Sequence, residues 1–179
     1  SGRVLSVSGW THPDVTPSDV GSHPYFDGRA ECWVWGTWAR AWKGMNQQNA
    51  SDILHKICRR GMDPYLYGAD LVSMAAEEKK RNLWAVRWLY WHQLNGGSCL
   101  RPPWSMVEHI GAGPGATNVK QDVEWGQPGG LREAPTIPDA WPEPVEHPDC
   151  AALWRARCGD RDDWRRKLMR VVKKVLCPW

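Results

Sequence analysis

The chain has 179 residues, of which 42% are hydrophobic and 24% are charged, and its formal net charge is +3. This composition excludes collagen, a coiled coil and a disordered chain, and no run of about 18 apolar residues predicts a membrane span. The length predicts a single domain over residues 1–179. The unusual feature is fourteen tryptophans against one phenylalanine.

Residues 1–29 are predicted to form an arm with one short strand. Leu5 and Val7 alternate with Ser6 and Ser8, a spacing that is typical of a strand with one buried face. Prolines and glycines interrupt the rest of this segment, so we expect turns there.

Residues 30–95 are predicted to form a helical part with four helices. Apolar residues recur at helical spacing over about 30–43, 51–60, 63–80 and 83–94, and Gly44, Gly61 and Gly96 follow three of these segments. The first and fourth helices are expected to pack together through seven tryptophans: Trp33, Trp35, Trp38, Trp42, Trp84, Trp88 and Trp91.

Residues 96–148 are rich in proline and glycine, and we expect a small irregular sheet there with strands at about 106–110 and 118–125. Residues 149–179 are predicted to form a helical tail, first over 150–158 and then over 160–176, where a basic amphipathic helix closes the chain. The expected fold class is therefore α+β and mostly helical, with a helical N-terminal half, the small sheet in the middle and the basic helix last.

A candidate nucleophile is Cys32, followed by Trp33 near the start of the predicted 30–43 helix. A helix N-terminus lowers the pKa of a thiol and favours the nucleophilic thiolate. His109 precedes a glycine-rich turn and could act as general base, and Asp122 on the predicted 118–125 strand could orient it. The alternative is that Cys32 is an unreactive buried thiol on a core helix.

The order Cys32, His109, Asp122, with Cys-Trp heading an apolar helix, resembles papain-like cysteine peptidases. The likeness is to the compact leader peptidases encoded by positive-strand RNA viruses. This resemblance implies a viral enzyme without a cofactor that cleaves a peptide bond in a peptide or protein substrate. It also implies a single self-releasing cut at the chain's own C-terminal junction, directly after Trp179.

A structural zinc site is a second possibility. His55 and Cys58 form one pair of residues three apart, and His147 and Cys150 form another. Zinc takes such residues in tetrahedral sets, so the two pairs could share one ion. The alternative is that these four residues occupy unrelated core and surface positions.

The basic C-terminal helix gives a third possibility, a non-enzymatic helical regulator that binds nucleic acid or a protein partner. Its candidate contact residues are Arg165, Arg166, Arg170, Lys173 and Lys174. The alternative is an ordinary solvated face, because acidic residues in the first turn and basic residues in the last turn complement the helix dipole.

The six cysteines are too sparse for a small disulfide scaffold. They favour a reducing, cytoplasmic compartment and leave secretion open.

Overall fold

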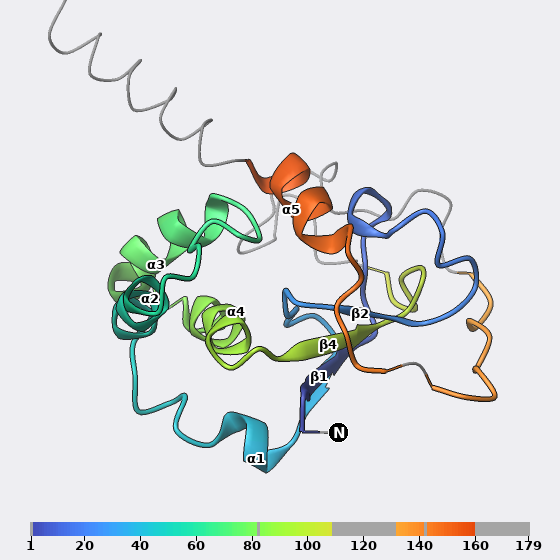
Figure 1. Ribbon diagram of the computed structural model, residues 1–179, viewed down its shortest axis with the longest axis horizontal. Coiled ribbons are helices and arrows are strands. Elements are labelled where there is room, and N and C mark those ends of the chain that lie inside the picture. The colour runs from blue at the N-terminus through green and yellow to red at the C-terminus, as the bar shows by residue number, and fades with distance from the viewer. Residues whose placement is uncertain (1, 82, 109–131, 142, 160–179) are drawn as a thin grey trace, which may run out of the picture.

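A computed structural model describes residues 2–81, 83–108, 132–141 and 143–159. Within these residues it contains a four-stranded mixed sheet, five α-helices and one short 3-10 helix, η1 (Pro13–Val15). Helices α2, α3 and α4 gather on one side of the molecule, the sheet lies beside them, and α5 lies at the top of this view, next to η1 (Figure 1).

The sheet joins distant parts of the chain. Its strands are β1 (Val4–Ser8), β2 (Tyr25–Asp27), β3 (Trp35–Thr37) and β4 (Ser98–Arg101), in the order β2-β4-β1-β3. β1 pairs with β4 in parallel, and the two outer pairings are antiparallel. The alternating sequence around Leu5 and Val7 forms a strand, as predicted, but its burial does not alternate as expected: Leu5, Ser6 and Ser8 are buried and Val7 is exposed.

The predicted helix over residues 30–43 is wrong. Residues 30–34 form a loop, β3 follows, and only α1 (Ala39–Trp42) is helical. The segment from Trp33 to Trp38 is rich in aromatic residues that favour strands, and Gly36 weakens a helix. β1 offers an edge on which this segment pairs, with Ser8 opposite Trp35 and Ser6 opposite Thr37.

Two of the predicted helices match α2 (Ala50–Arg59) and α4 (Trp84–Leu94). The side chain of Asn49 caps α2 by accepting a hydrogen bond from the Asp52 amide at 2.9 Å. Ile53 and Ile57 on α2 are fully buried. Helix α2 therefore follows its apolar stripe, whereas α4 buries Tyr90, His92 and Gln93 and leaves Trp84 38% exposed.

Helix α3 (Asp70–Arg81) begins later than the sequence predicts. The Asp63 carboxylate accepts a hydrogen bond from the Tyr65 amide at 3.0 Å, which closes a turn instead of a helical start. Gly68 has φ of 116°, a conformation outside any right-handed helix. These two features delay the helix to Asp70.

The expected fold class is also wrong in where it places the sheet. Three of its four strands lie between Val4 and Thr37, in the supposed arm and in the supposed first helix, and only β4 comes from the proline- and glycine-rich part. The described part of the predicted 106–110 strand, residues 106–108, is not a strand. The N-terminal half is therefore a mixture of strands and helices.

Helix α5 (Cys150–Cys158) matches the first predicted tail helix and ends at Gly159, where φ is 87°. The predicted strand at 118–125 and the predicted basic helix at 160–176 lie outside the described residues.

Four of the seven tryptophans predicted to pack together form one cluster: Trp35, Trp42, Trp84 and Trp88. Trp33 packs on Trp10 instead, at 4.8 Å between ring centroids, and Trp38 is 42% exposed. The centroid of the Trp88 ring lies 5.4 Å from that of Trp35 and 5.2 Å from that of Trp42. The centroids of the Trp35 and Trp84 rings are 6.0 Å apart. Trp88 is fully buried. This cluster joins β3 and α1 to α4.

Candidate functional site

Cys32 lies in the loop between β2 and β3, and no helix begins there. Its thiol is free and half-buried. Arg101 on β4 holds this loop, since its guanidinium donates to the carbonyl of Arg29 at 2.7 Å and to that of Trp10 at 3.3 Å. Cys32 is therefore positioned by a loop fixed to the central strand of the sheet.

The surroundings of Cys32 disfavour the thiolate. Burial raises the pKa of the Cys32 thiol to about 12, and the neighbouring Glu31 and Cys99 act in the same direction. Arg101 acts in the opposite direction with a smaller effect. The expected lowering of this pKa by a helix N-terminus is therefore wrong, and the described residues keep the thiol protonated.

The turn after Cys32 is strained. Val34 has φ of 43°, and it is the single residue other than glycine with positive φ in the part of the chain that the structure describes. A β-branched residue in this region is a conformational outlier, and such strain concentrates at functional sites. The Val34 carbonyl accepts a hydrogen bond from the Gly9 amide at 2.7 Å, which fixes the turn against the end of β1.

The chain that leads to His109 is anchored at the same place. The Met106 amide donates to the Gly9 carbonyl at 2.9 Å, and Val107 packs against the core. Gly9 thus bonds both to Val34 and to Met106. His109 and Asp122 themselves lie outside the described residues.

The two pairs of candidate zinc ligands, His55 with Cys58 and His147 with Cys150, do not come together in the structure. His55 and Cys58 are exposed on α2, whereas Cys150 is buried on α5, where its Sγ lies 3.9 Å from the Phe26 carbonyl oxygen. Across the described ranges, the single group of three potential ligands within 4.8 Å of one another is Asp19, His147 and Asp149. The four residues of the zinc hypothesis therefore do not form one site.

Both ring nitrogens of His147 already have partners in the group of Asp19, His147 and Asp149. Nδ1 accepts a hydrogen bond from the Asp149 amide at 3.3 Å, and Nε2 lies 3.0 Å from an oxygen of Asp19. With Nδ1 accepting, Nε2 carries the proton and donates to the carboxylate. This arrangement ties residues 147–149 to the N-terminal part of the chain, and it explains the group without a metal.

The basic residues of the regulator hypothesis, from Arg165 to Lys174, lie outside the described residues. The two arginines that precede them on α5 have partners: Arg155 donates to the Leu66 carbonyl at 3.0 Å, and Arg157 pairs with Asp14. They fix α5 to the body of the protein.

Sequence reasoning missed two buried polar pairs. Ser6 Oγ and His92 Nε2 are 3.1 Å apart, and Asp27 and Arg101 form an ion pair at 2.7 Å with both side chains fully buried. In the sequence, nothing distinguishes His92 from its neighbours in a largely apolar predicted helix. No local pattern links Asp27 to Arg101, which lies far along the chain. Their partners are set by the sheet topology.

No family model matches this chain, and no match to a curated protein or to a solved structure is found. None of the described helices is long and apolar enough to cross a membrane.

Proposed function

We propose that the protein is a small cysteine peptidase in which Cys32 is the nucleophile, His109 the general base and acid, and Asp122 the residue that orients the imidazole. The observation that carries this proposal is the double role of Gly9, which bonds both to the strained turn after Cys32 and to the segment that leads into His109.

Chain length is compatible with this arrangement. His109 follows Met106 by three residues, and three extended residues span at most about 10 Å. Val34, bonded to the same Gly9, follows Cys32 by two residues. The chain from Met106 to position 109 is therefore long enough for an imidazole there to approach the Cys32 loop, which is compatible with the proposed pair.

The proposed reaction has two stages. His109 takes the proton of the Cys32 thiol, the thiolate attacks the peptide carbonyl, and the imidazolium gives its proton to the leaving amine as the C–N bond breaks. Water, deprotonated by His109, then attacks the thioester, which releases the carboxylate product and returns the thiol. The substrate is a peptide bond, and self-release by cleavage of the protein's own polypeptide is among the candidate reactions.

Because the pKa of Cys32 is raised, the mechanism must include a group that stabilises the thiolate. A thiol with a pKa of about 12 is almost fully protonated at neutral pH, so the thiolate must be stabilised by an imidazolium beside it. Removing His109 should therefore suppress the reactivity of Cys32 and leave that of other thiols unchanged.

Alkylation of the cysteines by iodoacetamide at pH 7 tests this pairing. In the unmodified protein Cys32 should react faster than Cys58, the exposed thiol on α2 that serves as an internal reference. His109→Ala should slow Cys32 by about tenfold or more, since one pKa unit is a tenfold change in thiolate, and should leave Cys58 unaffected. Peptide mass spectrometry measures both rates.

A fusion in which a reporter domain follows Trp179 tests the cleavage itself. The unmodified chain should release the reporter, whereas Cys32→Ala and His109→Ala should not, and Cys58→Ala should behave like the unmodified chain. Release by Cys32→Ala, or a Cys32 that alkylates no faster than Cys58 in the unmodified protein, would overturn the proposal.

A further inference from the structure

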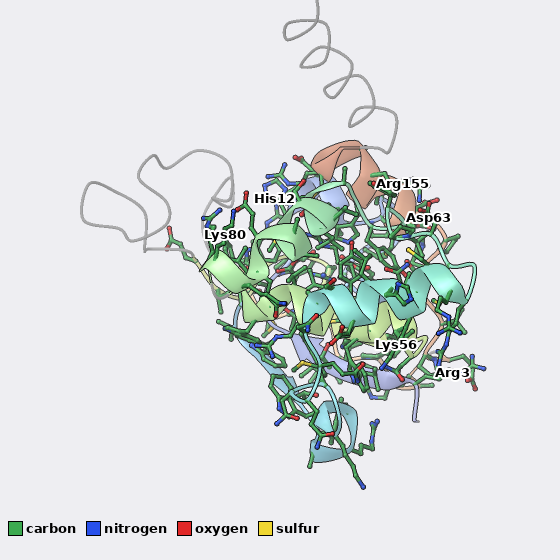
Figure 2. All side chains as sticks on the ribbon, turned by 90° about the vertical axis from the view of Figure 1, so that its left-hand side faces the viewer. Arg3, His12, Lys56, Asp63, Lys80 and Arg155 are labelled. Atoms are coloured by element: carbon green, nitrogen blue, oxygen red, sulfur yellow. The ribbon has the colours of Figure 1, made fainter. Side chains whose placement is uncertain are left out.

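One face of the sheet is turned away from α4 and α5. On the opposite face, Ser6 lies 3.1 Å from His92 of α4, and Asp27 accepts a hydrogen bond from Trp154 of α5. Figure 2 looks at the molecule from its helical side, with α2 and α3 in front of the sheet. Successive side chains of a strand point to opposite faces, so the strand neighbours of Ser6 and Asp27 include residues that point away from α4 and α5.

Val7, Leu100 and Phe26 form an apolar row on this outer face. Val7 pairs with Leu100, and Leu100 pairs with Phe26, so their side chains share one face. All three line a cavity with a volume of about 410 Å³, which is in the usual range for ligand sites. A second cavity of about 270 Å³ shares Val7, Leu100 and Trp141 with the first. The two cavities therefore adjoin, and we call them together the outer groove.

Exposed apolar side chains gather at the outer groove. Among the described residues eight large apolar side chains are exposed, and five of them line this groove: Val7, Trp38, Met106, Ile137 and Trp141. Single exposed apolar residues are ordinary, whereas a group of them at one hollow marks a binding surface. The outer groove is therefore a candidate site for an apolar ligand.

Arg40 lies at one end of the outer groove, because it lines the first cavity and not the second. Its guanidinium donates to the carbonyls of Gly2 at 3.3 Å and Val4 at 2.8 Å, and it lies 5.0 Å from the centroid of the Trp38 ring. These contacts are with neutral groups, so they orient the guanidinium and leave its positive charge in place.

The charges around the outer groove favour an anion. None of the described residues that line its two cavities is acidic. Arg101, the other cation in the lining, is paired with Asp27 inside the sheet. A guanidinium binds a carboxylate through charge-assisted hydrogen bonds. A second copy of the same face would bring no acid to Arg40, so a ligand with its own carboxylate fits the groove better than a symmetric dimer does.

We propose that the outer groove binds a free fatty acid of medium chain length. Its carboxylate pairs with Arg40, and its hydrocarbon chain lies across Leu100 and Val7 toward Met106. Binding requires neither Cys32 nor His109, so this inference is independent of the peptidase proposal.

Titration of the Cys32→Ala protein with octanoate, followed by ¹H–¹⁵N NMR, tests this inference. Octanoate is used below the concentration at which it forms micelles, and 1-octanol and octylammonium serve as probes with the same chain and a different head group. We expect saturable shifts of the Trp38 and Trp141 indole N–H signals with octanoate. Binding of 1-octanol should be about tenfold weaker, because it lacks the charge that pairs with Arg40, and octylammonium should bind most weakly.

Arg40→Gln should weaken octanoate about tenfold and leave 1-octanol unchanged. Arg59→Gln is the matched control, because Arg59 is an exposed arginine on α2 that does not line the outer groove. Trp141→Ala should weaken both octanoate and 1-octanol, since it removes an apolar wall that is 55% exposed. Val145→Ala is its control, because Val145 is an exposed apolar residue of the same segment that lines neither cavity.

Four results would overturn the inference. The first is the absence of saturable shifts with octanoate, which is expected if another part of the chain or a second copy covers the groove. The second is equal affinity for octanoate and for 1-octanol or octylammonium. The third is equal weakening by Arg40→Gln and Arg59→Gln. The fourth is a response to vesicles of phosphatidylcholine and phosphatidylserine without a response to octanoate, which would indicate a membrane surface as the partner.

Discussion

His92 shows how a single residue makes stability depend on pH. Its ring is fully buried, lies edge-on to Trp88 at 4.8 Å between centroids, and has Ser6 Oγ as its partner. Burial lowers the pKa of His92 from 6.5 to about 3, and Arg101 acts in the same direction. The folded protein therefore contains His92 in the neutral form at any pH above about 4.

The sign of the effect follows from proton binding. Between pH 6.5 and 3 the unfolded chain binds a proton at His92 and the folded chain does not, so the free energy of unfolding falls as the pH falls. We expect a loss of about 1.4 kcal/mol per pH unit below pH 6 from this residue. Urea unfolding at pH 7, 6 and 5 measures it.

His92→Gln should keep an acceptor for Ser6 and remove the titration, so its stability should change less between pH 7 and 5 than that of the unmodified protein. His55→Gln is the control, because His55 is exposed on α2. Identical pH dependence in His92→Gln and in the unmodified protein would contradict the assignment of a buried neutral His92.

At the scale of elements, the turn between Cys32 and β3 has an identifiable conformational cost. Val34 adopts φ of 43° and is 62% exposed, so little packing offsets the strain. Val34→Gly should raise the free energy of unfolding by about 1 kcal/mol, because glycine adopts this conformation without strain. Urea unfolding of the variant checks the sign.

Val7→Gly is the matched control for that substitution. Val7 is 36% exposed, but it lies in β1, where the backbone is extended. Replacing it should destabilise the protein by about 1 kcal/mol, since glycine weakens a strand. If Val34→Gly destabilised the protein as much as Val7→Gly, the turn would not be strained.

These elements also show what the sequence could predict. Helix α2 follows from local periodicity, because its buried residues Ala50, Ile53 and Ile57 share one face. Helices α4 and α5 also form where the sequence predicts them, but α4 buries residues on several faces, so its apolar content is more informative than its spacing. β3 could not be predicted in the same way, since a three-residue strand depends on the edge that β1 supplies. Cys32 could be chosen as a candidate from its neighbours in the sequence. Its burial, its high pKa and the strained turn beside it depend on contacts with β1 and β4.

At the scale of the whole molecule, one buried polar network connects most of the fold. Asp27 on β2 pairs with Arg101 on β4 and accepts a hydrogen bond from the Trp154 indole on α5 at 2.8 Å. Arg29 stacks on Trp154 at 4.2 Å and pairs with Asp70 at the start of α3 at 2.8 Å. Two strands and two helices therefore share this network.

Asp27→Asn should destabilise the protein by about 3–5 kcal/mol, because it leaves the fully buried Arg101 without its counter-charge. Urea unfolding followed by tryptophan fluorescence measures the loss, and hydrogen exchange should show α5 opening more readily. Glu77→Gln is the control: it breaks the exposed pair of Glu77 with Arg81 and should cost less than about 0.5 kcal/mol. Equal costs for the two variants would contradict a central role for the Asp27 network.

The strand order has a consequence for synthesis of the chain. β4 is an inner strand between β1 and β2, yet of the four strands in the described residues it is the last to be translated. β1 is translated before the other three strands and has β3 as its one available neighbour until Arg101 emerges, so this sheet cannot close while the stretch from β1 to β4 is being translated. Long-range pairing of this kind is slow and exposes strand edges in the meantime. A nascent chain that stalls before β4 therefore leaves two additional strand edges unpaired, one on β1 and one on β2, and the residues around Cys32 reach their final positions only after β4 is inserted.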